Sequence, residues 1–261
     1  MNRFIAGGLV LAAHLVAPMA QAQPARPAKP TVVLVHGAFA DSSSWNGVIS
    51  ILQRGGYRVV AAANPLRGVR ADADAVAGVV KGIEGPVVLV GHSYGGSVIS
   101  EAAEGRSNVK ALVYVAAFAP EAGETALGLT GKFPGSTLGG ALAPPVKLTS
   151  GGNDLYIEQS RFPQQFAADV PASQARLMAA GQRPIAEAAL TEASTAPAWK
   201  SVPSWFIYGS QDKNIPPAAL GFMAERAKSR QTVEVKGASH VVMVSHAPAV
   251  ATLIEKAAAA R

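Results

Sequence analysis

Six short runs of apolar, largely β-branched residues recur along the chain, and longer segments with helical spacing separate them. The runs are Thr31–Val35, Arg58–Ala63, Val87–Val90, Ala111–Ala116, Ser204–Tyr208 and Thr232–Val235. Runs that are hydrophobic at successive positions are typical of strands buried on both faces of a sheet. The segments expected to be helical are Ser44–Arg54, Ala71–Ile83, Ser97–Glu104, Pro216–Ser229 and Ala247–Ala260. This alternation predicts an α/β fold with a doubly wound, mostly parallel sheet of about six strands.

The alternation is interrupted once, between about residues 121 and 200. This segment contains no clear buried strand, many Gly, Pro and small residues, recurring aromatic residues and one helical stretch, Ser173–Ala180. A long insertion between two core strands is typical of a cap over a pocket. A disordered linker is the alternative, but the aromatic residues and the helical stretch argue against it. We therefore expect a helical cap after the fourth strand, within one domain that spans residues 31–261.

The N-terminal segment has the pattern of a signal peptide. A basic Met1-Asn2-Arg3 precedes an apolar run, and Ala20-Gln21-Ala22 matches an A-x-A cleavage site. The apolar run falls short of the ~20 residues that a membrane-spanning helix needs. The sequence predicts a cleaved signal peptide over residues 1–22, a leader over 23–30, and export to the periplasm or the medium without a stable membrane anchor after cleavage.

Composition excludes several classes of site. The chain contains no cysteine, so disulfides, thiolate catalysis and zinc–sulfur sites are excluded. The formal net charge is +6, but Lys and Arg are scattered and do not interleave with aromatic residues. Because a nucleic-acid site needs clustered basic residues, we expect no nucleic-acid partner. The sequence carries no signal for an oligomeric state.

The segment Val87–Gly96, VVLVGHSYGG, combines a strand with a G-x-S-x-G turn around Ser93. A G-x-S-x-G sequence between a strand and a helix is typical of a nucleophile elbow, which lifts the serine hydroxyl above the edge of the sheet. Side chains at Gly91 and Gly95 would collide with neighbouring backbone in so tight a turn. The helix that follows would favour developing negative charge near its N-terminus. We therefore predict that Ser93 is a catalytic nucleophile.

A serine nucleophile needs a base, and the base needs an acid that orients it. In this class of turn the chain order is Ser, then Asp or Glu, then His. Asp212 follows the strand Ser204–Tyr208, and His240 follows the next strand, Thr232–Val235. Asp212 could merely cap a helix and His240 could be a loop residue, but the order and the strand ends favour a Ser93–His240–Asp212 triad. Asp154 and Asp169 are rival acids within the cap.

The loop after the first strand predicts the remaining parts of the site. His36-Gly37-Ala38-Phe39 is a small, glycine-containing loop, which lets a backbone amide point into the pocket. We predict an oxyanion hole formed by the N–H groups of Ala38 and Tyr94. Phe39 and Met243 are expected to line the substrate pocket. His36 is interpreted as a structural residue, and the sequence points to no metal or organic cofactor.

Four segments together resemble the α/β-hydrolase superfamily: HGAF, GHSYGG, YGSQDKNIPP and GASHVVMVSHAPAV. They are most similar to its small capped branch, which includes plant methylesterases, hydroxynitrile lyases and bacterial esterase-like proteins. The resemblance implies the α/β-hydrolase fold and a cofactor-free serine hydrolase that forms an acyl-enzyme from a small ester. Hydroxynitrile lyases of this branch carry Thr where this chain has Gly37 and Lys where it has Val241, so the resemblance points away from cyanohydrin cleavage.

Two other interpretations stay open at this point. Hydrolysis of a lactone or of a carbon–carbon bond uses the same triad. A small-molecule binding protein would use the capped pocket without any chemistry. The resemblance implies a small-molecule ester as the partner of this chain and ester hydrolysis as its function, and the predicted triad makes a role in binding alone the weaker interpretation.

Overall fold

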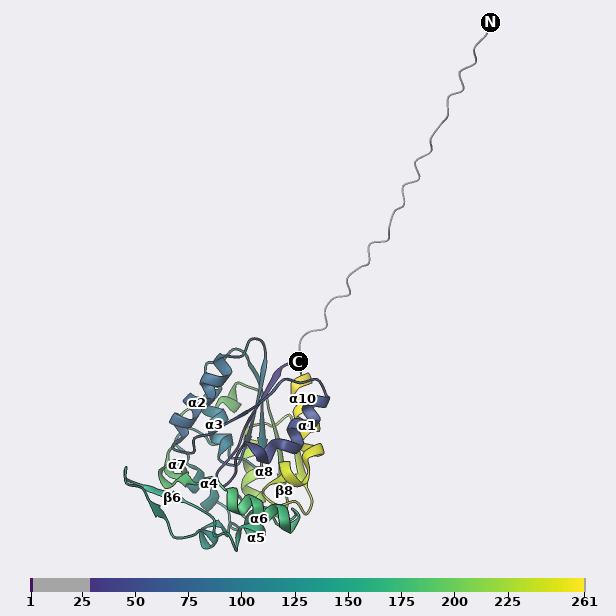
Figure 1. Ribbon diagram of the computed structural model, residues 1–261. Coiled ribbons are helices and arrows are strands. Elements are labelled where there is room, and N and C mark those ends of the chain that lie inside the picture. Colours follow the sequence, from purple (N-terminus) through teal and green to yellow (C-terminus); the bar gives the residue numbers. More distant parts are fainter. Residues whose placement is uncertain (2–28, 261) are drawn as a thin grey trace.

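The computed structural model describes Met1 and residues 29–260 of the chain (Figure 1). The predicted signal peptide, residues 1–22, and the leader, residues 23–30, lie almost wholly outside the described residues, so export stays a prediction. No helix within the described residues is both long and apolar enough to span a bilayer.

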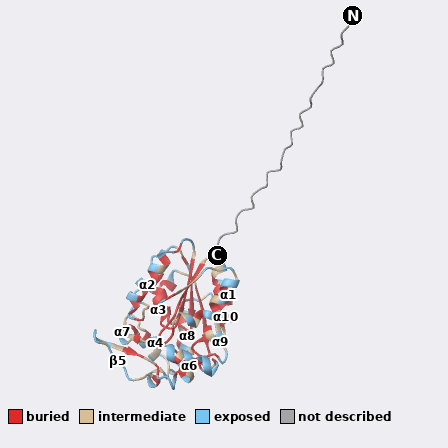
Figure 2. Cartoon of the chain, viewed as in Figure 1, coloured by how far each residue is buried: buried red, intermediate tan, exposed pale blue. Residues whose placement is uncertain are grey.

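A six-stranded sheet forms the centre of the molecule, and all of its neighbouring strands run parallel. The strand order is β2-β1-β3-β4-β8-β9. The central strands are buried on both faces, as their continuous apolar runs predict (Figure 2). The predicted doubly wound sheet is therefore confirmed. Its strands are β1 (Thr31–Val35), β2 (Val59–Ala62), β3 (Val87–His92), β4 (Val109–Val115), β8 (Ser204–Gly209) and β9 (Gln231–Val235).

Helices cover both faces of this sheet (Figure 1). Helices α2 and α3 pack against each other on one face, and α1 and α10 pack against each other on the other. A helix follows each strand of this sheet along the chain, as in the crossover units of parallel sheets. The elements are η1 (Ser42–Trp45), α1 (Asn46–Arg54), α2 (Val69–Lys81), α3 (Gly95–Ala102), α8 (Pro217–Arg226), α9 (Val242–Ser245) and α10 (Ala247–Ala259).

The strand order fixes where a site can form. From β1 the chain continues to β2 on one side, and β3 then pairs with β1 on the other side. The loops that leave β1 and β3 therefore diverge at the carboxyl ends of these two strands. In open α/β sheets such a switch point opens a crevice where ligands bind. The loops of Ala38 and Ser93 meet at this crevice.

The insertion between β4 and β8 lies at the carboxyl end of the sheet (Figure 1). Besides its helices it contains a small antiparallel sheet in the order β5-β6-β7. The sequence does not predict this sheet, because strands of two or three residues are too short to show a period. Its elements are α4 (Ala126–Gly131), η2 (Leu138–Ala141), β5 (Val146–Lys147), β6 (Asn153–Leu155), α5 (Phe162–Phe166), α6 (Ala172–Gly181), β7 (Ile185–Ala186), α7 (Glu187–Thr191) and η3 (Ala198–Lys200).

Ion pairs connect this cap to the core. Arg67, in the loop after β2, places Nη1 2.7 Å from Oδ1 of Asp154 in the cap. Arg226 of α8 donates to both carboxylate oxygens of Glu124 at 2.9 and 2.7 Å. The hydrogen bonds from Arg226 hold the pKa of Glu124 below its usual value. Two parallel guanidinium–carboxylate hydrogen bonds fix the orientation of the two side chains as well as their distance, so they hold the cap in a defined position over the sheet.

Candidate active site

Ser93 occupies a strained turn between β3 and α3. Its φ angle is 54°, in the left-handed region that non-glycine residues rarely adopt. The surrounding backbone holds this conformation, because Ser93 N donates to Val115 O at 3.2 Å and Ser93 O accepts from Phe118 N at 3.1 Å. Strain that the structure holds in place in this way is typical of functional sites. The turn leaves the serine side chain at the wall of a cavity.

The two glycines of the turn are required by close backbone packing. A Cβ on Gly91 would lie 2.5 Å from Gly95 O, and a Cβ on Gly95 would lie 2.6 Å from Val35 O. Real Cβ atoms do not approach backbone this closely, so any side chain here would force the turn apart. The expected steric reason for the G-x-S-x-G pattern is thus confirmed.

Asp212 and His240 form a buried pair at the neighbouring strand ends. Asp212 Oδ2 lies 2.6 Å from His240 Nδ1, and both side chains are almost fully buried. The other oxygen, Asp212 Oδ1, accepts the backbone N–H groups of Asn214 and Ile215 at 2.8 and 3.0 Å. Because a carboxylate only accepts, the proton of the imidazole lies on Nδ1 and the lone pair on Nε2. Sequence reasoning did not find the two amides, although the side chain of an Asp in a turn commonly accepts the backbone N–H two residues further on.

Ser93 and His240 line the same cavity, which has a volume of about 250 Å³. His240 Nε2 is buried and has no hydrogen-bond partner among the described residues. No hydrogen bond joins it to the hydroxyl of Ser93 within this part of the chain. The structure thus brings Ser93 and His240 to one cavity, with Asp212 behind His240; the Asp212–His240 contact is made and the Ser93–His240 contact is not. Such contacts often close only around a substrate.

The loop after β1 lies directly against the serine turn. A Cβ on Gly37 would lie 2.6 Å from Ser93 Cβ and 3.2 Å from Tyr94 N. Ala38 and Tyr94 both line the cavity, and neither backbone N–H donates a hydrogen bond to another described residue. The next amide, that of Phe39, donates to Arg183 O at 3.0 Å. Two free N–H groups therefore remain beside Ser93, where an oxyanion would form.

We predict that Gly37→Ala lowers kcat by about 10²-fold, because the added methyl group pushes the Ala38 amide away from the serine turn. The measurement is steady-state turnover of a small ester, with circular dichroism as a check of folding. Gly78→Ala is the matched control, because a Cβ there has nothing within 4 Å. Equal activity of the Gly37→Ala and Gly78→Ala proteins would contradict this account.

Two buried histidines support the site without facing the cavity. His92 Nε2 donates to His240 O at 3.2 Å, and the two rings lie 4.8 Å apart. Burial, together with the neighbouring His240, holds the pKa of His92 well below its ordinary value. His36 accepts Asn64 N at 3.1 Å on Nε2 and contacts Gly37 O through Nδ1. Both rings therefore stay neutral and position the two loops that carry Ala38 and His240.

Tyr94 ties the serine turn to a buried carboxylate that the sequence did not reveal. The Tyr94 hydroxyl donates to Asp72 Oδ2 at 2.8 Å, and Arg67 N donates to Asp72 Oδ1 at 3.0 Å. Asp72 is fully buried, and burial raises its pKa above the ordinary value although these hydrogen bonds act against the shift. Burial also raises the pKa of the Tyr94 phenol.

The raised pKa of Asp72 predicts a pH-dependent term in stability. A carboxyl whose pKa is higher in the folded state binds its proton more tightly there, so its stabilising contribution is largest below the unfolded pKa and is lost as pH rises. We expect the unfolding free energy of wild type to rise relative to that of Asp72→Asn as the pH is lowered from about 7 to about 4. Urea denaturation of both proteins across this range measures it. A difference that does not change with pH would refute it.

Of the remaining residues predicted for the site, some line the cavity and others do not. Phe39 lines the cavity. Met243 does not: it is fully buried in the core within α9, where the neighbouring Val242 is buried as well. The rival acids are engaged elsewhere, since Asp154 pairs with Arg67 and Asp169 accepts from the hydroxyl of Ser239. Within the described residues no group of three His, Asp or Glu side chains could hold a metal ion.

The sequence model of the alpha/beta hydrolase family matches residues 32–253, so the chain belongs to this family. A carbendazim hydrolyzing esterase from Nocardioides sp. (strain SG-4G) is 34% identical over 113 residues, which cover 38% of this chain and 47% of that protein. The match thus spans about half the length of this relative.

Solved structures of two esterases share the fold. Polyneuridine aldehyde esterase superposes with a TM-score of 0.75 at 19% identity, covering 88% of this chain and 99% of that chain. A methylesterase from Arabidopsis superposes with a TM-score of 0.69 at 17% identity, covering 87% and 98%. The α/β-hydrolase fold that the resemblance implies is therefore confirmed.

Proposed function

We propose that this protein is a serine hydrolase that cleaves a small carboxylic ester through an acyl-enzyme. The observation that carries the proposal is the buried Asp212–His240 contact of 2.6 Å, which leaves Nε2 of His240 without a partner in a residue that lines the same cavity as Ser93. A histidine with this tautomer can take a proton from a serine hydroxyl. The strained turn holds that hydroxyl beside two free backbone amides.

The reaction proceeds in two halves. His240 Nε2 takes the proton of Ser93 while Oγ attacks the ester carbonyl, and the amides of Ala38 and Tyr94 stabilise the negative oxygen. The protonated imidazole, which Asp212 stabilises, gives its proton to the leaving alcohol. A water molecule then loses a proton to His240 as it attacks the acyl-enzyme, and Ser93 regains the proton as the acid departs.

The cavity wall supports a small, uncharged ester as substrate. Its volume of about 250 Å³ lies below the ~300–1,000 Å³ of pockets for drug-sized ligands. The described lining contains no Lys or Arg, so an anionic acid portion would find no countercharge, and the carboxylate of Glu187 in this lining already accepts from Asn153 Nδ2 at 2.7 Å. Much of the wall is apolar and comes from the cap as well as the core, through Phe118, Leu127, Leu138, Leu155, Leu190 and Ile215.

The names of the similar proteins support the same reaction. One is a carbendazim hydrolyzing esterase, one a polyneuridine aldehyde esterase and one a methylesterase. Gly37 and Val241 stand where the cyanohydrin-cleaving members of the resembled branch carry Thr and Lys. These residues favour ester hydrolysis over cyanohydrin cleavage.

Intact-mass analysis with a fluorophosphonate probe, together with hydrolysis of p-nitrophenyl esters of increasing acyl length, tests this proposal. We expect one adduct on Ser93 and turnover that falls beyond a limiting chain length. Labelling without ester turnover would favour lactone or carbon–carbon bond hydrolysis. If neither labelling nor turnover occurs, the proposal is wrong and a small-molecule binding role replaces it.

A further inference from the structure

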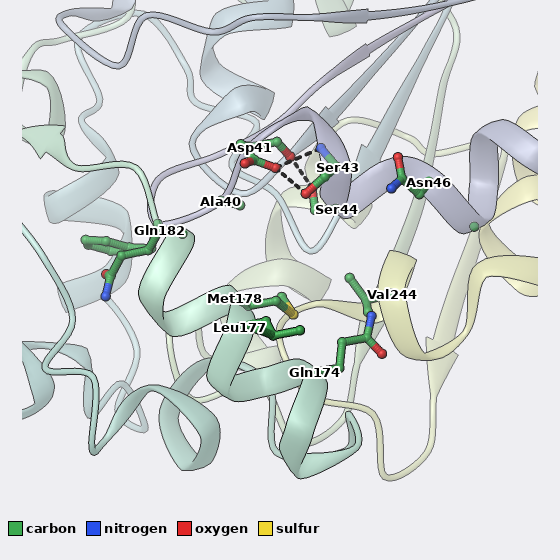
Figure 3. Close-up of a pocket in the computed structure, with 13 residues that line it drawn as sticks. Ala40, Asp41, Ser43, Ser44, Asn46, Gln174, Leu177, Met178, Gln182 and Val244 are labelled. Atoms are coloured by element: carbon green, nitrogen blue, oxygen red, sulfur yellow. Dashed lines mark hydrogen bonds between the residues drawn. The ribbon is translucent and has the colours of Figure 1, made fainter.

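A second hollow lies beside the catalytic cavity, on the side of η1, α1, α6 and α9. We call it the outer groove; its volume is about 360 Å³. Figure 3 shows Gln174, Leu177 and Met178 of α6 on one side of it, and Ser43, Ser44 and Asn46 of η1 and α1 on the other. Phe39 lines both the outer groove and the catalytic cavity. Phe39 is therefore part of the wall between them.

Phe39 is held firmly in that wall. Its side chain is almost completely buried, and its backbone N–H donates to Arg183 O of the cap at 3.0 Å. Its ring meets the ring of Phe166 edge to face, with centroids 6.1 Å apart. Its φ angle is 59°, so this phenylalanine occupies a backbone conformation that is costly for any residue with a side chain. Strain of this kind is typical of positions that serve a function.

The wall lies on the side of the cavity where the alcohol of an ester must leave. The leaving oxygen takes its proton from His240, so the alcohol portion points toward this imidazole. The ring of Phe166 lies 5.1 Å from the His240 ring and also contacts Phe39. A longer alcohol that extends past His240 would therefore meet the Phe39–Phe166 pair before it reached the outer groove.

The outer groove has the chemistry of a site for an uncharged chain. Its apolar side chains include Leu177, Met178 and Val244. The others are mostly uncharged hydroxyls and amides, and no Lys or Arg is among the described residues that line it. The carboxylate of Asp41 is already bound, because Oδ1 accepts Ser43 N at 2.8 Å and caps η1. A neutral alcohol chain with ether oxygens matches such a surface.

We propose that Phe39 is the specificity-determining residue that limits the alcohol portion of the substrate, by separating the catalytic cavity from the outer groove. The inference rests on the proposed ester hydrolysis. Shortening the side chain joins the two spaces and lets the distal part of a long, uncharged alcohol occupy the groove. The hydrogen bond from Phe39 to Arg183 O is donated by the backbone N–H, so the loop keeps this contact when the ring is removed.

The test compares kcat/KM for ethyl acetate, hexyl acetate and the acetate of diethylene glycol monoethyl ether. Phe39→Ala is expected to raise the long-to-ethyl ratio of kcat/KM by about tenfold or more over wild type, the scale on which a hydrophobic pocket discriminates by size. Phe39→Leu, which keeps more of the buried volume, is expected to raise it less. Circular dichroism and melting curves establish that both variants fold.

A large side chain placed in the outer groove shows whether the gain in the Phe39→Ala protein depends on this groove or on a general loosening of the catalytic cavity. Gln174→Trp in the Phe39→Ala background is expected to return the ratio to the wild-type value, because the indole occupies the space that the long alcohol uses. Arg176→Trp is the matched control: this residue is exposed on the same helix and lines neither hollow. In the wild-type background Gln174→Trp is expected to leave the ratio unchanged, because Phe39 already separates the catalytic cavity from the outer groove.

Three results would overturn the inference while leaving the proposed function standing. They are an unchanged ratio in a folded Phe39→Ala or Phe39→Leu protein, a gain that survives Gln174→Trp, and a gain seen only when the acyl chain of methyl esters is lengthened. Failure of the wild-type protein to hydrolyse ethyl acetate and every other ester would instead refute the proposed function, and this inference with it.

Discussion

Replacing Ser93 by alanine is expected to lower kcat toward a small ester by about 10⁶-fold, the loss typical of removing a triad serine. In the proposed mechanism this hydroxyl forms the acyl-enzyme, and alanine has no group that could take its place. The free amides and the cavity remain, so a residual rate above the uncatalysed one is expected. Alanine meets the same backbone cost at a φ of 54° as serine does, so the fold is expected to persist.

The measurement is turnover of p-nitrophenyl acetate together with labelling by the fluorophosphonate probe, and both should be lost. Ser97→Ala is the matched control, because Ser97 is a buried serine on the adjoining helix whose hydroxyl has no hydrogen-bond partner among the described residues. The control is expected to keep its activity and its labelling. A Ser93→Ala protein that turns over at the wild-type rate would refute the mechanism.

The sheet could be predicted from the sequence because its signals are local. β1 begins and ends at the predicted residues, and β3 runs two residues past the predicted Val87–Val90, up to the serine turn. Parallel strands bring their carboxyl ends to one edge, so order along the chain was enough to place Ser93, Asp212 and His240 near one another. The contact between Asp212 and His240 follows from that geometry.

The cavity wall could not be predicted, because distant segments build it. Phe166 packs on both Phe39 and His240, yet it comes from a five-residue helix whose position depends on how the cap folds back. Asp72 lies in an ordinary helical pattern, and only its contact with Tyr94 shows that it supports the serine turn. Met243 illustrates the opposite error: it was expected to line the pocket, but it is fully buried and is not among the described residues that line the cavity.

Replacing Asp212 by asparagine is expected to lower kcat by about 10⁴-fold, although the side chain keeps its size and shape. The reason lies in the hydrogen bonds at the two carboxylate oxygens. Asp212 Oδ1 accepts two backbone amides, from Asn214 and Ile215, so an asparagine must place its own oxygen there. Its amide nitrogen then faces Nδ1 of His240. Because that nitrogen donates, the imidazole must accept on Nδ1 and carry its proton on Nε2.

In this tautomer Nε2 of His240 carries a proton and has no lone pair for the hydroxyl of Ser93. His240 therefore cannot act as the base, although its ring stays in the same place. The measurement is kcat of the variant, with the proton of His240 located by NMR of the ¹⁵N-labelled imidazole. Asp154→Asn and Asp169→Asn serve as controls, since these cap carboxylates are not hydrogen-bonded to His240. If Asp212→Asn retained wild-type kcat while either control lost it, the acid of the triad would be one of the cap residues, and the buried Asp212–His240 contact would be structural only.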